Sequence, residues 1–234
     1  MKHQSGKRVA IVQSCYIPWK GYFDLIAAAD AFIFYDDVQY TRQDWRNRNR
    51  IKTQQGLLWL TVPVKFGHTQ LIRDTEIAGS AWAEKHWRSL CQYYKSAPWF
   101  GPVAERLEPI YRQSHTHLSA LNRRLIATLC DMLRIDTPLS CSWEYERMEG
   151  KSERLVHLCQ QVGAAEYISG PAAKDYLDVG LFEAAGIKVS WFDYDGYPEY
   201  RQLWGGFEHN VSILDLLFNC GPEARRYMKC GAMA

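Results

Sequence analysis

Two short apolar runs separated by one helical segment, all within residues 9–35, constrain the fold of this chain more than any other feature. Residues 9–13 (VAIVQ) and 31–35 (AFIFY) have the composition of buried strands. Between them, four apolar residues recur at the spacing of one helix face: Tyr22, Leu25, Ile26 and Ala29. A connection this short favours a helical crossover between neighbouring parallel strands.

The same alternation returns near the carboxyl end of the chain. The segments in order are a helix at 153–162, a strand at 165–169, a helix at 172–185, a strand at 187–194 and a helix at 212–218. The predicted fold class is therefore α/β, with a Rossmann-like, mostly parallel sheet.

The middle of the chain has a different pattern. Residues 57–64 (LLWLTVPV) are predicted to form a strand, and about 80–134 are predicted to be a helical insert. We expect one domain over residues 8–221, with residues 1–7 and 222–234 as terminal tails.

The charge balance argues against a nucleic-acid partner. The 234 residues include 28 basic and 26 acidic side chains, which gives a formal net charge of +2. Nucleic-acid binding usually requires a basic excess on one face, so an anionic ligand would have to be held locally. The nine Trp and 14 Tyr residues suit either a rich core or a cavity that stacks on rings.

The seven cysteines are odd in number and contain no Cys-x-x-Cys pair, which disfavours a disulfide framework or a zinc site. Free thiols suggest the cytoplasm. The first 25 residues lack the pattern of a leader, and no run reaches the ~18 apolar residues of a membrane span. Nothing in the sequence specifies an oligomeric state.

The first candidate site is the turn after the first predicted strand. In open α/β sheets, ligands bind beyond the carboxyl ends of strands, where helix N-termini attract anions. The candidate binding residues there are Gln13, Tyr16, Trp19, Lys20, Gly21 and Tyr22. A purely structural turn with packed aromatic side chains explains the same residues.

The second candidate site follows the second strand and contains Asp36, Asp37 and Gln39. Adjacent residues on an extended chain point in opposite directions, so one carboxylate would face the cavity, and we favour Asp36. Such a carboxylate could bind Mg²⁺, orient a sugar hydroxyl or act as a base. The sequence requires no cofactor, although Mg²⁺ is possible. The alternative is a solvated turn.

The third candidate site is the basic segment that contains Trp45, Asn47, Arg48 and Lys52. Alternation in an extended segment would place Arg46, Arg48 and Arg50 on one face, where guanidinium groups could bind a phosphate. A solvated basic loop is the alternative.

The fourth candidate site combines Ser169, Gly170 and Lys174 at a tight turn before a helix. A plain turn explains these residues equally simply. His86 is a further candidate, because an imidazole near Cys15 would suit acyl transfer. A packed imidazole and an inert thiol are the alternative.

Several motifs resemble the WbqC-like family over roughly residues 8–221. The motifs are Gln13-x-x-Tyr16-x-Pro18-Trp19-x-Gly21-Tyr22-Phe23, Asp36-x-Val38-Gln39-Tyr40, Trp45-x-Asn47-Arg48-x-x-Ile51-Lys52, Trp59-Leu60-Thr61-Val62-Pro63-Val64, His86-Trp87, Tyr167-Ile168-Ser169-Gly170 and the segment Ser212 to Asn219. The resemblance implies a role in bacterial O-antigen or other surface-glycan biosynthesis.

A weaker resemblance to HUP-type nucleotidyltransferases involves Trp19-Lys20-Gly21-Tyr22, where that group has His-x-Gly-His. Both histidines are replaced, so this likeness supports the fold more than the reaction. We expect a transferase of acyl, aminoacyl or nucleotidyl type. Its small-molecule substrate would be a nucleotide-activated amino sugar or an acyl donor. The alternative is a non-catalytic ligand-binding or scaffolding protein of the same pathway.

Overall fold

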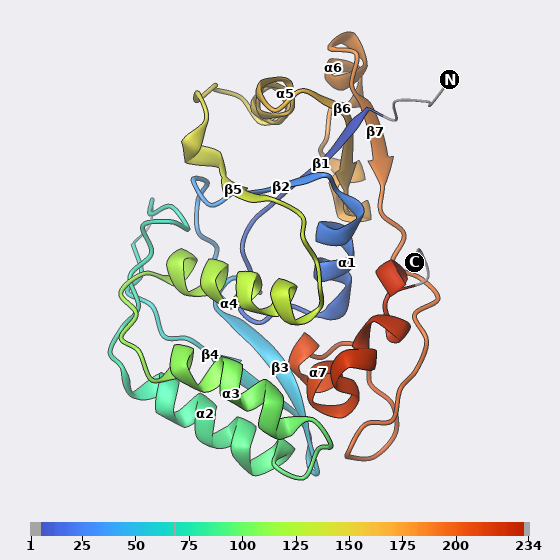
Figure 1. The fold of residues 1–234 in the computed structure, drawn as a ribbon. Helices are drawn as coiled ribbons and strands as arrows, with labels where there is room; N and C mark the ends of the chain where they lie inside the picture. The colour runs from blue at the N-terminus through green and yellow to red at the C-terminus, as the bar shows by residue number, and fades with distance from the viewer. Residues whose placement is uncertain (1–5, 68, 232–234) are drawn as a thin grey trace.

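A five-stranded parallel sheet forms the centre of the protein (Figure 1). The computed structural model describes residues 6–67 and 69–231. Across the sheet the strands are β5 (Leu139–Cys141), β2 (Ala31–Phe34), β1 (Lys7–Val12), β6 (Ala164–Ser169) and β7 (Lys188–Trp191). All four neighbouring pairs are parallel. The Rossmann-like α/β class predicted from the sequence is confirmed.

The unit at the start of the chain folds as predicted. Helix α1 (Lys20–Ala28) connects β1 to β2, whose register pairs Val9 with Ala31. Side chains of β1 alternate between two apolar clusters, with Ala10 on one face of the sheet and Ile11 on the other. A strand buried on both faces explains the continuous apolar run in the sequence.

In the second half of the chain, helix α5 (Ser152–Gln161) lies between β5 and β6, and helix α6 (Val179–Ala184) lies between β6 and β7. The prediction of one continuous helix over 172–185 is wrong, because the structure has two separate elements there. A short 3₁₀ turn (Pro171–Asp175) precedes α6, and the Asp178 carboxylate accepts a hydrogen bond from the Gly180 amide. Asp178 therefore starts a new helix as an N-cap.

The middle of the chain lies beside the sheet as three helices and a hairpin. The helices are α2 (Ala81–Tyr94), α3 (Phe100–Tyr111) and α4 (Leu118–Met132). Strands β3 (Arg48–Thr53) and β4 (Gly56–Thr61) pair in antiparallel fashion. Helix α7 (Ile213–Cys220) lies against β3, and the Ser212 amide donates to the Arg50 carbonyl at 2.9 Å. Figure 1 shows this layer below the sheet.

Both ends of the described chain are packed. Strand β1 begins at Lys7, inside the segment expected to be a tail. The carboxyl end forms two 3₁₀ turns, Gly221–Tyr227 and Lys229–Gly231, and the Lys229 and Cys230 amides donate to Asp24. The remaining tail residues, 1–5 and 232–234, lie outside the described residues.

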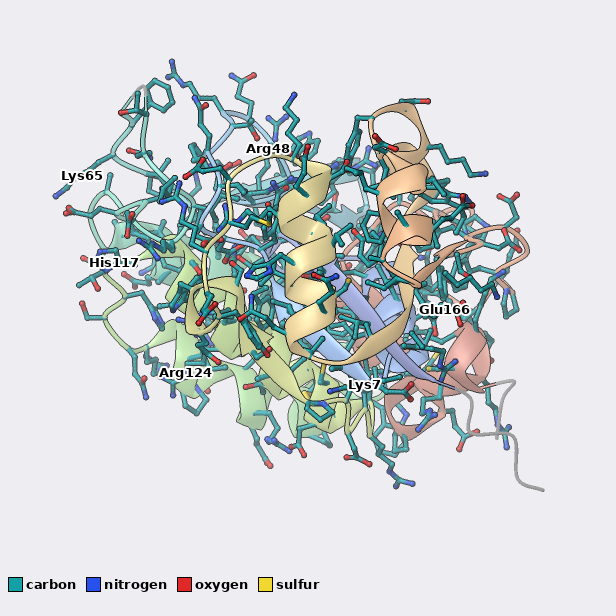
Figure 2. All side chains as sticks on the ribbon, turned by 90° about the horizontal axis from the view of Figure 1, so that it is seen from above. Lys7, Arg48, Lys65, His117, Arg124 and Glu166 are labelled. Atoms are coloured by element: carbon teal, nitrogen blue, oxygen red, sulfur yellow. The ribbon has the colours of Figure 1, made fainter. Side chains whose placement is uncertain are left out.

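The arrangement of charged side chains and the lengths of the helices add two observations. Basic side chains are spread around the outline rather than gathered on one side, as the labelled Lys7, Arg48, Lys65 and Arg124 show (Figure 2). In the described part of the chain, no helix has both the length and the apolar character that crossing a bilayer demands.

Candidate functional site

A cavity of about 500 Å³ opens at the carboxyl ends of the central strands. Its wall contains Gln13 at the end of β1, Tyr35 at the end of β2, and Ser169 and Gly170 at the end of β6. Strand order reverses between β1 and β6, and ligands of open α/β sheets bind at that position. The volume falls within the range of small-molecule sites. We call this space the switch-point cavity.

Three basic side chains line the switch-point cavity: Arg46, Lys151 and Arg154. None of the described residues in its lining is acidic. Arg154 lies in the first turn of α5, is 7% exposed and forms an ion pair with Asp37. Because the negative partners lie behind the wall, the cavity surface itself presents basic groups to a ligand.

Arg46 and Lys151 are less fully paired than Arg154. Arg46 forms an ion pair of 3.1 Å with Asp44, and its Nε is buried without a hydrogen-bond partner. Lys151 has no ion pair with any residue in the described ranges. An anionic group in the cavity could therefore satisfy both side chains.

Four tyrosines complete the lining: Tyr35, Tyr167, Tyr176 and Tyr194. Burial raises the pKa of Tyr35, so its hydroxyl stays protonated and can donate a hydrogen bond. Burial likewise raises the pKa of Tyr194 to about 12. The Arg154 guanidinium lies 5.0 Å from the centre of the Tyr35 ring. Flat rings beside guanidinium groups suit a ligand that combines an anion with a ring.

The two candidate carboxylates support the wall of the cavity. Asp36 is fully buried, and its carboxylate accepts hydrogen bonds from the Ser14 amide (2.7 Å) and the Ser119 hydroxyl (2.5 Å). Burial raises the pKa of Asp36. Asp37 accepts hydrogen bonds from Ser142 and Arg154. Neither residue is in the cavity lining, so Asp36 fixes the end of β1 and Asp37 fixes Arg154.

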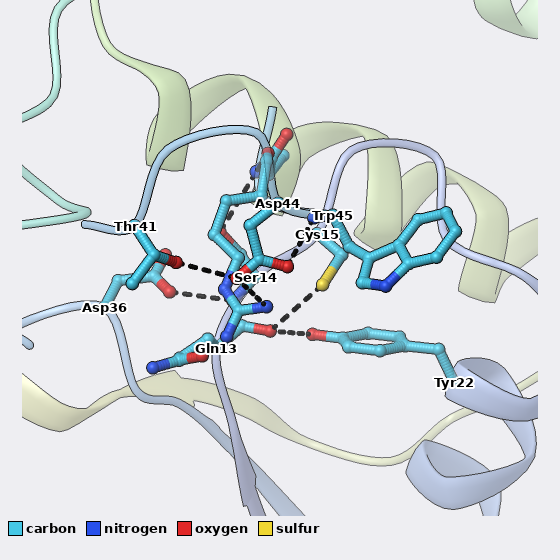
Figure 3. A network of polar contacts seen from close by, with 10 residues as sticks. Gln13, Ser14, Cys15, Tyr22, Asp36, Thr41, Asp44 and Trp45 are labelled. Carbon is cyan, nitrogen blue, oxygen red and sulfur yellow. Dashed lines mark hydrogen bonds and ion pairs between the residues drawn. The ribbon is translucent and has the colours of Figure 1, made fainter. Parts of the chain in front are cut away.

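Figure 3 shows how the end of β1 is held. The Gln13 carbonyl accepts a hydrogen bond from the Tyr22 hydroxyl at 3.0 Å and a weak one from the Cys15 thiol at 3.8 Å. Burial raises the pKa of Cys15 to about 12, which keeps the thiol protonated. Thiolate nucleophilicity is therefore suppressed at this position.

A second cavity, of about 210 Å³, lies next to this turn and includes two indoles. Its lining residues are Cys15, Pro18, Trp19, Tyr22, Trp45, Asn49 and Asn210. We call this space the indole cavity. The Trp19 ring also covers Gly21, because a Cβ at Gly21 would lie 2.3 Å from that ring. The start of α1, predicted to bind phosphate, is thus occupied by an indole.

His86 and Tyr16 lie in the interior and line neither cavity. The Tyr16 hydroxyl lies 2.8 Å from His86 Nδ1 and 2.9 Å from the Tyr111 hydroxyl. Burial lowers the pKa of His86 to about 4, so the imidazole is neutral near pH 7. Cys15 and His86 thus have different hydrogen-bond partners.

Lys20, Asn47 and Lys52 are also buried, and each has an internal partner. Lys20 Nζ donates to the Pro198 carbonyl at 3.2 Å, and burial lowers its pKa to about 8. Asn47 donates to the Val62 carbonyl, and Lys52 donates to Gln202 and to the Gly206 carbonyl.

The remaining predicted residues lie elsewhere. Lys174 approaches the ring of Trp191, with its Nζ 5.7 Å from the centre, and Gln39 forms a β-bridge with Leu71. Arg48 extends from β3 and stacks on Trp59 of β4 at 4.4 Å. The predicted single row of arginines is wrong. Strand β3 begins only at Arg48, so Arg46 turns toward the sheet while Arg48 and Arg50 face the hairpin.

Sequence reasoning missed Lys151, Arg154, Tyr176 and Tyr194 of the switch-point cavity, whereas Tyr35 and Tyr167 border the second and fourth candidate sites. One available signal was Gly150-Lys151-Ser152 before the predicted helix at 153–162, which is a glycine-containing basic segment at a helix start. Within the described ranges, no group of three or more His, Cys, Asp or Glu residues has the arrangement of a metal site.

Strand order and cavity together define a Rossmann-like α/β protein with a basic, tyrosine-lined cavity at the switch point. The model of the WbqC-like protein family matches residues 13–227, and the chain belongs to this family. It is 59% identical over 226 residues to the uncharacterized protein Rv1507c of Mycobacterium tuberculosis, covering 95% of this chain and 98% of that protein. No solved structure matches the chain.

Proposed function

We propose that the switch-point cavity binds a nucleotide-activated sugar or a related phosphorylated glycan precursor. The observation that carries this proposal is the convergence of Arg46, Lys151 and Arg154 on the carboxyl ends of β1 and β6. Phosphate groups are bound in this position of Rossmann-like sheets, and guanidinium groups bind them with two hydrogen bonds. Tyr35 and Tyr194 supply rings for a base or a sugar.

We further propose that the protein is a transferase of surface-glycan biosynthesis. Its resemblance to a family associated with that pathway supports the direction of the proposal. In a transfer that releases a phosphate group, Arg46 and Arg154 would stabilise the developing negative charge. Asp37 would act as a positioning residue, because its ion pair fixes Arg154 at the wall. A Mg²⁺ ion would enter with the phosphates.

Ligand-induced thermal stabilisation tests the proposal, because a ligand that binds only the folded state raises the melting temperature. The purified protein is mixed with sugar nucleotides, nucleoside triphosphates and acyl-CoAs, with and without Mg²⁺. We expect one sugar nucleotide to raise the melting temperature, and Arg46→Gln to reduce that rise. Arg88→Gln is the matched control, since Arg88 lies on α2 and pairs with Glu84. The proposal would be contradicted if none of the phosphorylated compounds raised the melting temperature.

A second candidate function is ligand binding without catalysis. Within the part of the chain that the structure describes, the lining of the switch-point cavity contains neither a carboxylate nor an imidazole. The carboxylates of Asp36 and Asp37 already accept internal hydrogen bonds. The described lining therefore lacks the two commonest kinds of acid–base group, and its titratable side chains are the basic residues and the tyrosines. Incubation of the stabilising sugar nucleotide with amine and hydroxyl acceptors distinguishes the two functions. Consumption of the nucleotide supports a transferase, and binding without consumption supports a binding protein.

A further inference from the structure

A row of indole and guanidinium groups lies on the hairpin, outside the switch-point cavity. The rings of Trp45 and Trp59 are 5.5 Å apart, and both are strongly exposed, at 43% and 42%. The guanidinium groups of Arg48 and Arg50 lie 4.4 Å and 5.3 Å from the Trp59 ring. Cross-strand pairing of Arg50 with Trp59 fixes this arrangement.

The two arginines of this row carry charge that the protein does not neutralise. Among the described residues, neither Arg48 nor Arg50 forms an ion pair, and Arg50 Nε is buried without a hydrogen-bond partner. The Asp44 carboxylate also lines the groove, but it is paired with Arg46 and accepts hydrogen bonds from Thr41 and the Trp45 amide. An anionic ligand would satisfy the free guanidinium groups.

The row continues into the indole cavity through Trp45. Trp45 lines that cavity and also a groove of about 270 Å³ that contains Arg48, Arg50 and Trp59. Amide side chains accompany both spaces, with Gln43 in the groove and Asn210 in the cavity. The surface therefore offers two consecutive ring-binding places that share one indole wall.

We propose that the indole cavity and the hairpin groove bind an acidic oligosaccharide, with one sugar in the cavity and the next along Trp45 and Trp59. Indole faces pack on the apolar faces of sugar rings, while the guanidinium groups of Arg48 and Arg50 bind the carboxylates. Single-stranded nucleic acid also stacks on exposed aromatic rings. The net charge of +2 and the dispersed basic residues disfavour that partner.

The oligosaccharide would be the acceptor for transfer from the switch-point cavity, and that role alone rests on the proposed function. The two spaces are neighbours, because Trp19 of the indole cavity lies 5.3 Å from Tyr194 of the switch-point cavity. A second contact also connects the two cavities: the hydroxyl of Tyr22, which lines the indole cavity, donates at 3.0 Å to the carbonyl of Gln13, which lines the switch-point cavity. Acidic-glycan binding itself does not depend on any donor.

Tetragalacturonate is the probe, and neutral maltotetraose and an oligothymidylate are the comparisons, each titrated by calorimetry and tryptophan fluorescence. We expect tetragalacturonate to bind, with affinity reduced about tenfold by Trp59→Ala and by Arg48→Gln. Both side chains are on the surface hairpin, and circular dichroism and melting temperature verify that the variants fold. Arg88→Gln controls for the loss of one surface charge and should bind as the wild-type protein does.

Three results would overturn this proposal: no binding of tetragalacturonate, binding that the Trp59 and Arg48 variants leave unchanged, or stronger binding of the oligothymidylate. Binding of sugar nucleotides by Trp59→Ala is measured in parallel. If that variant retains nucleotide binding while losing tetragalacturonate, the two sites are independent. If the wild-type protein binds tetragalacturonate and no nucleotide, the proposed donor site fails while the oligosaccharide site stands.

Discussion

Arg154 and Asp37 form a buried ion pair at the edge of the switch-point cavity, although they are 117 positions apart in the chain. The side chains are only 9% and 8% exposed. Asp37 follows β2 and Arg154 begins α5, so the pair joins the end of a strand to the start of a helix on the same side of the sheet. Ser142 supplies a further hydrogen bond to the carboxylate.

Removing one member of this pair should lower the free energy of unfolding more than removing both members. Asp37→Asn leaves the buried Arg154 charge without its ionic partner, although the hydrogen bond to the backbone carbonyl of residue 37 remains, and we expect the free energy of unfolding to fall by about 3 kcal/mol. The double variant Asp37→Asn/Arg154→Met should recover most of that loss. Urea denaturation at pH 7 measures all three proteins. Additive losses in the double variant would show that the two side chains are not coupled.

His86 predicts a pH dependence of stability. Its pKa is lowered from 6.5 to about 4 in the folded state, so between these values the unfolded chain binds a proton that the folded chain does not. The free energy of unfolding is therefore unaffected by the titration of His86 above pH 6.5. It falls by about 1.4 kcal/mol per pH unit as the pH is lowered from 6.5 toward 4. Urea denaturation across this range should show a shallower slope in His86→Gln. An unchanged slope would contradict a buried neutral imidazole.

Gly21 should tolerate no larger side chain while Trp19 is present. A Cβ at position 21 would lie 2.3 Å from the Trp19 ring, and overpacking of this kind typically costs about 1–3 kcal/mol. We expect Gly21→Ala to lower the melting temperature and Gly21→Ala/Trp19→Leu to restore part of it. Gly101→Ala is the control, because a Cβ there meets nothing within 4 Å. Equal effects of the two alanine variants would show that the indole moves freely.

Two tyrosines that donate to the same carboxylate should contribute unequally to the free energy of unfolding. Tyr94 donates to Asp215 at 2.7 Å and accepts from the Lys52 amide at 3.0 Å, whereas Tyr200 donates to Asp215 at 2.8 Å. Tyr94→Phe leaves two buried groups without their partner, so we expect a loss of about 2–3 kcal/mol. Tyr200→Phe should cost less, because both of its partners keep another hydrogen bond: Asp215 also accepts from Asn219 at 3.4 Å, and Gln202, which donates to Tyr200 at 3.2 Å, also donates to the Glu208 carbonyl at 2.9 Å. Thermal and urea denaturation should rank the variants in this order; the reverse order would contradict it.

The predictions from local sequence succeeded where neighbouring residues decide the outcome. The apolar runs at 9–13 and 31–35 and the helical spacing of Leu25 and Ile26 are local features, and they correspond to β1, β2 and α1. The helix at 172–185 failed because the Asp178 cap and the preceding turn were not recognised. Gln13 and the pair Ser169 and Gly170, predicted as parts of two separate sites, line one cavity because parallel strands end at the same edge of the sheet.

Contacts between distant segments, both at the candidate site and in the interior, come from tertiary packing. Arg154 meets Asp37 from the far half of the chain, and His86 meets Tyr16 across 70 positions. The periodicity of a helix does not specify which distant segment it will face. Arg46 and Arg48 are separated because the strand that carries Arg48 starts after Arg46, and only strand pairing with β4 fixes that boundary.

The sequence by itself determined the Rossmann-like class and the family, because apolar periodicity and extended motifs survive without any knowledge of contacts. Tertiary structure alone decided which polar groups were left facing a cavity. Asp36 and His86 have internal hydrogen-bond partners, whereas, among the described residues, Arg46 Nε has none and Lys151 lines the cavity without an ion pair. Burial makes such partners necessary, because a polar group removed from water must be paired within the protein or by what binds to it.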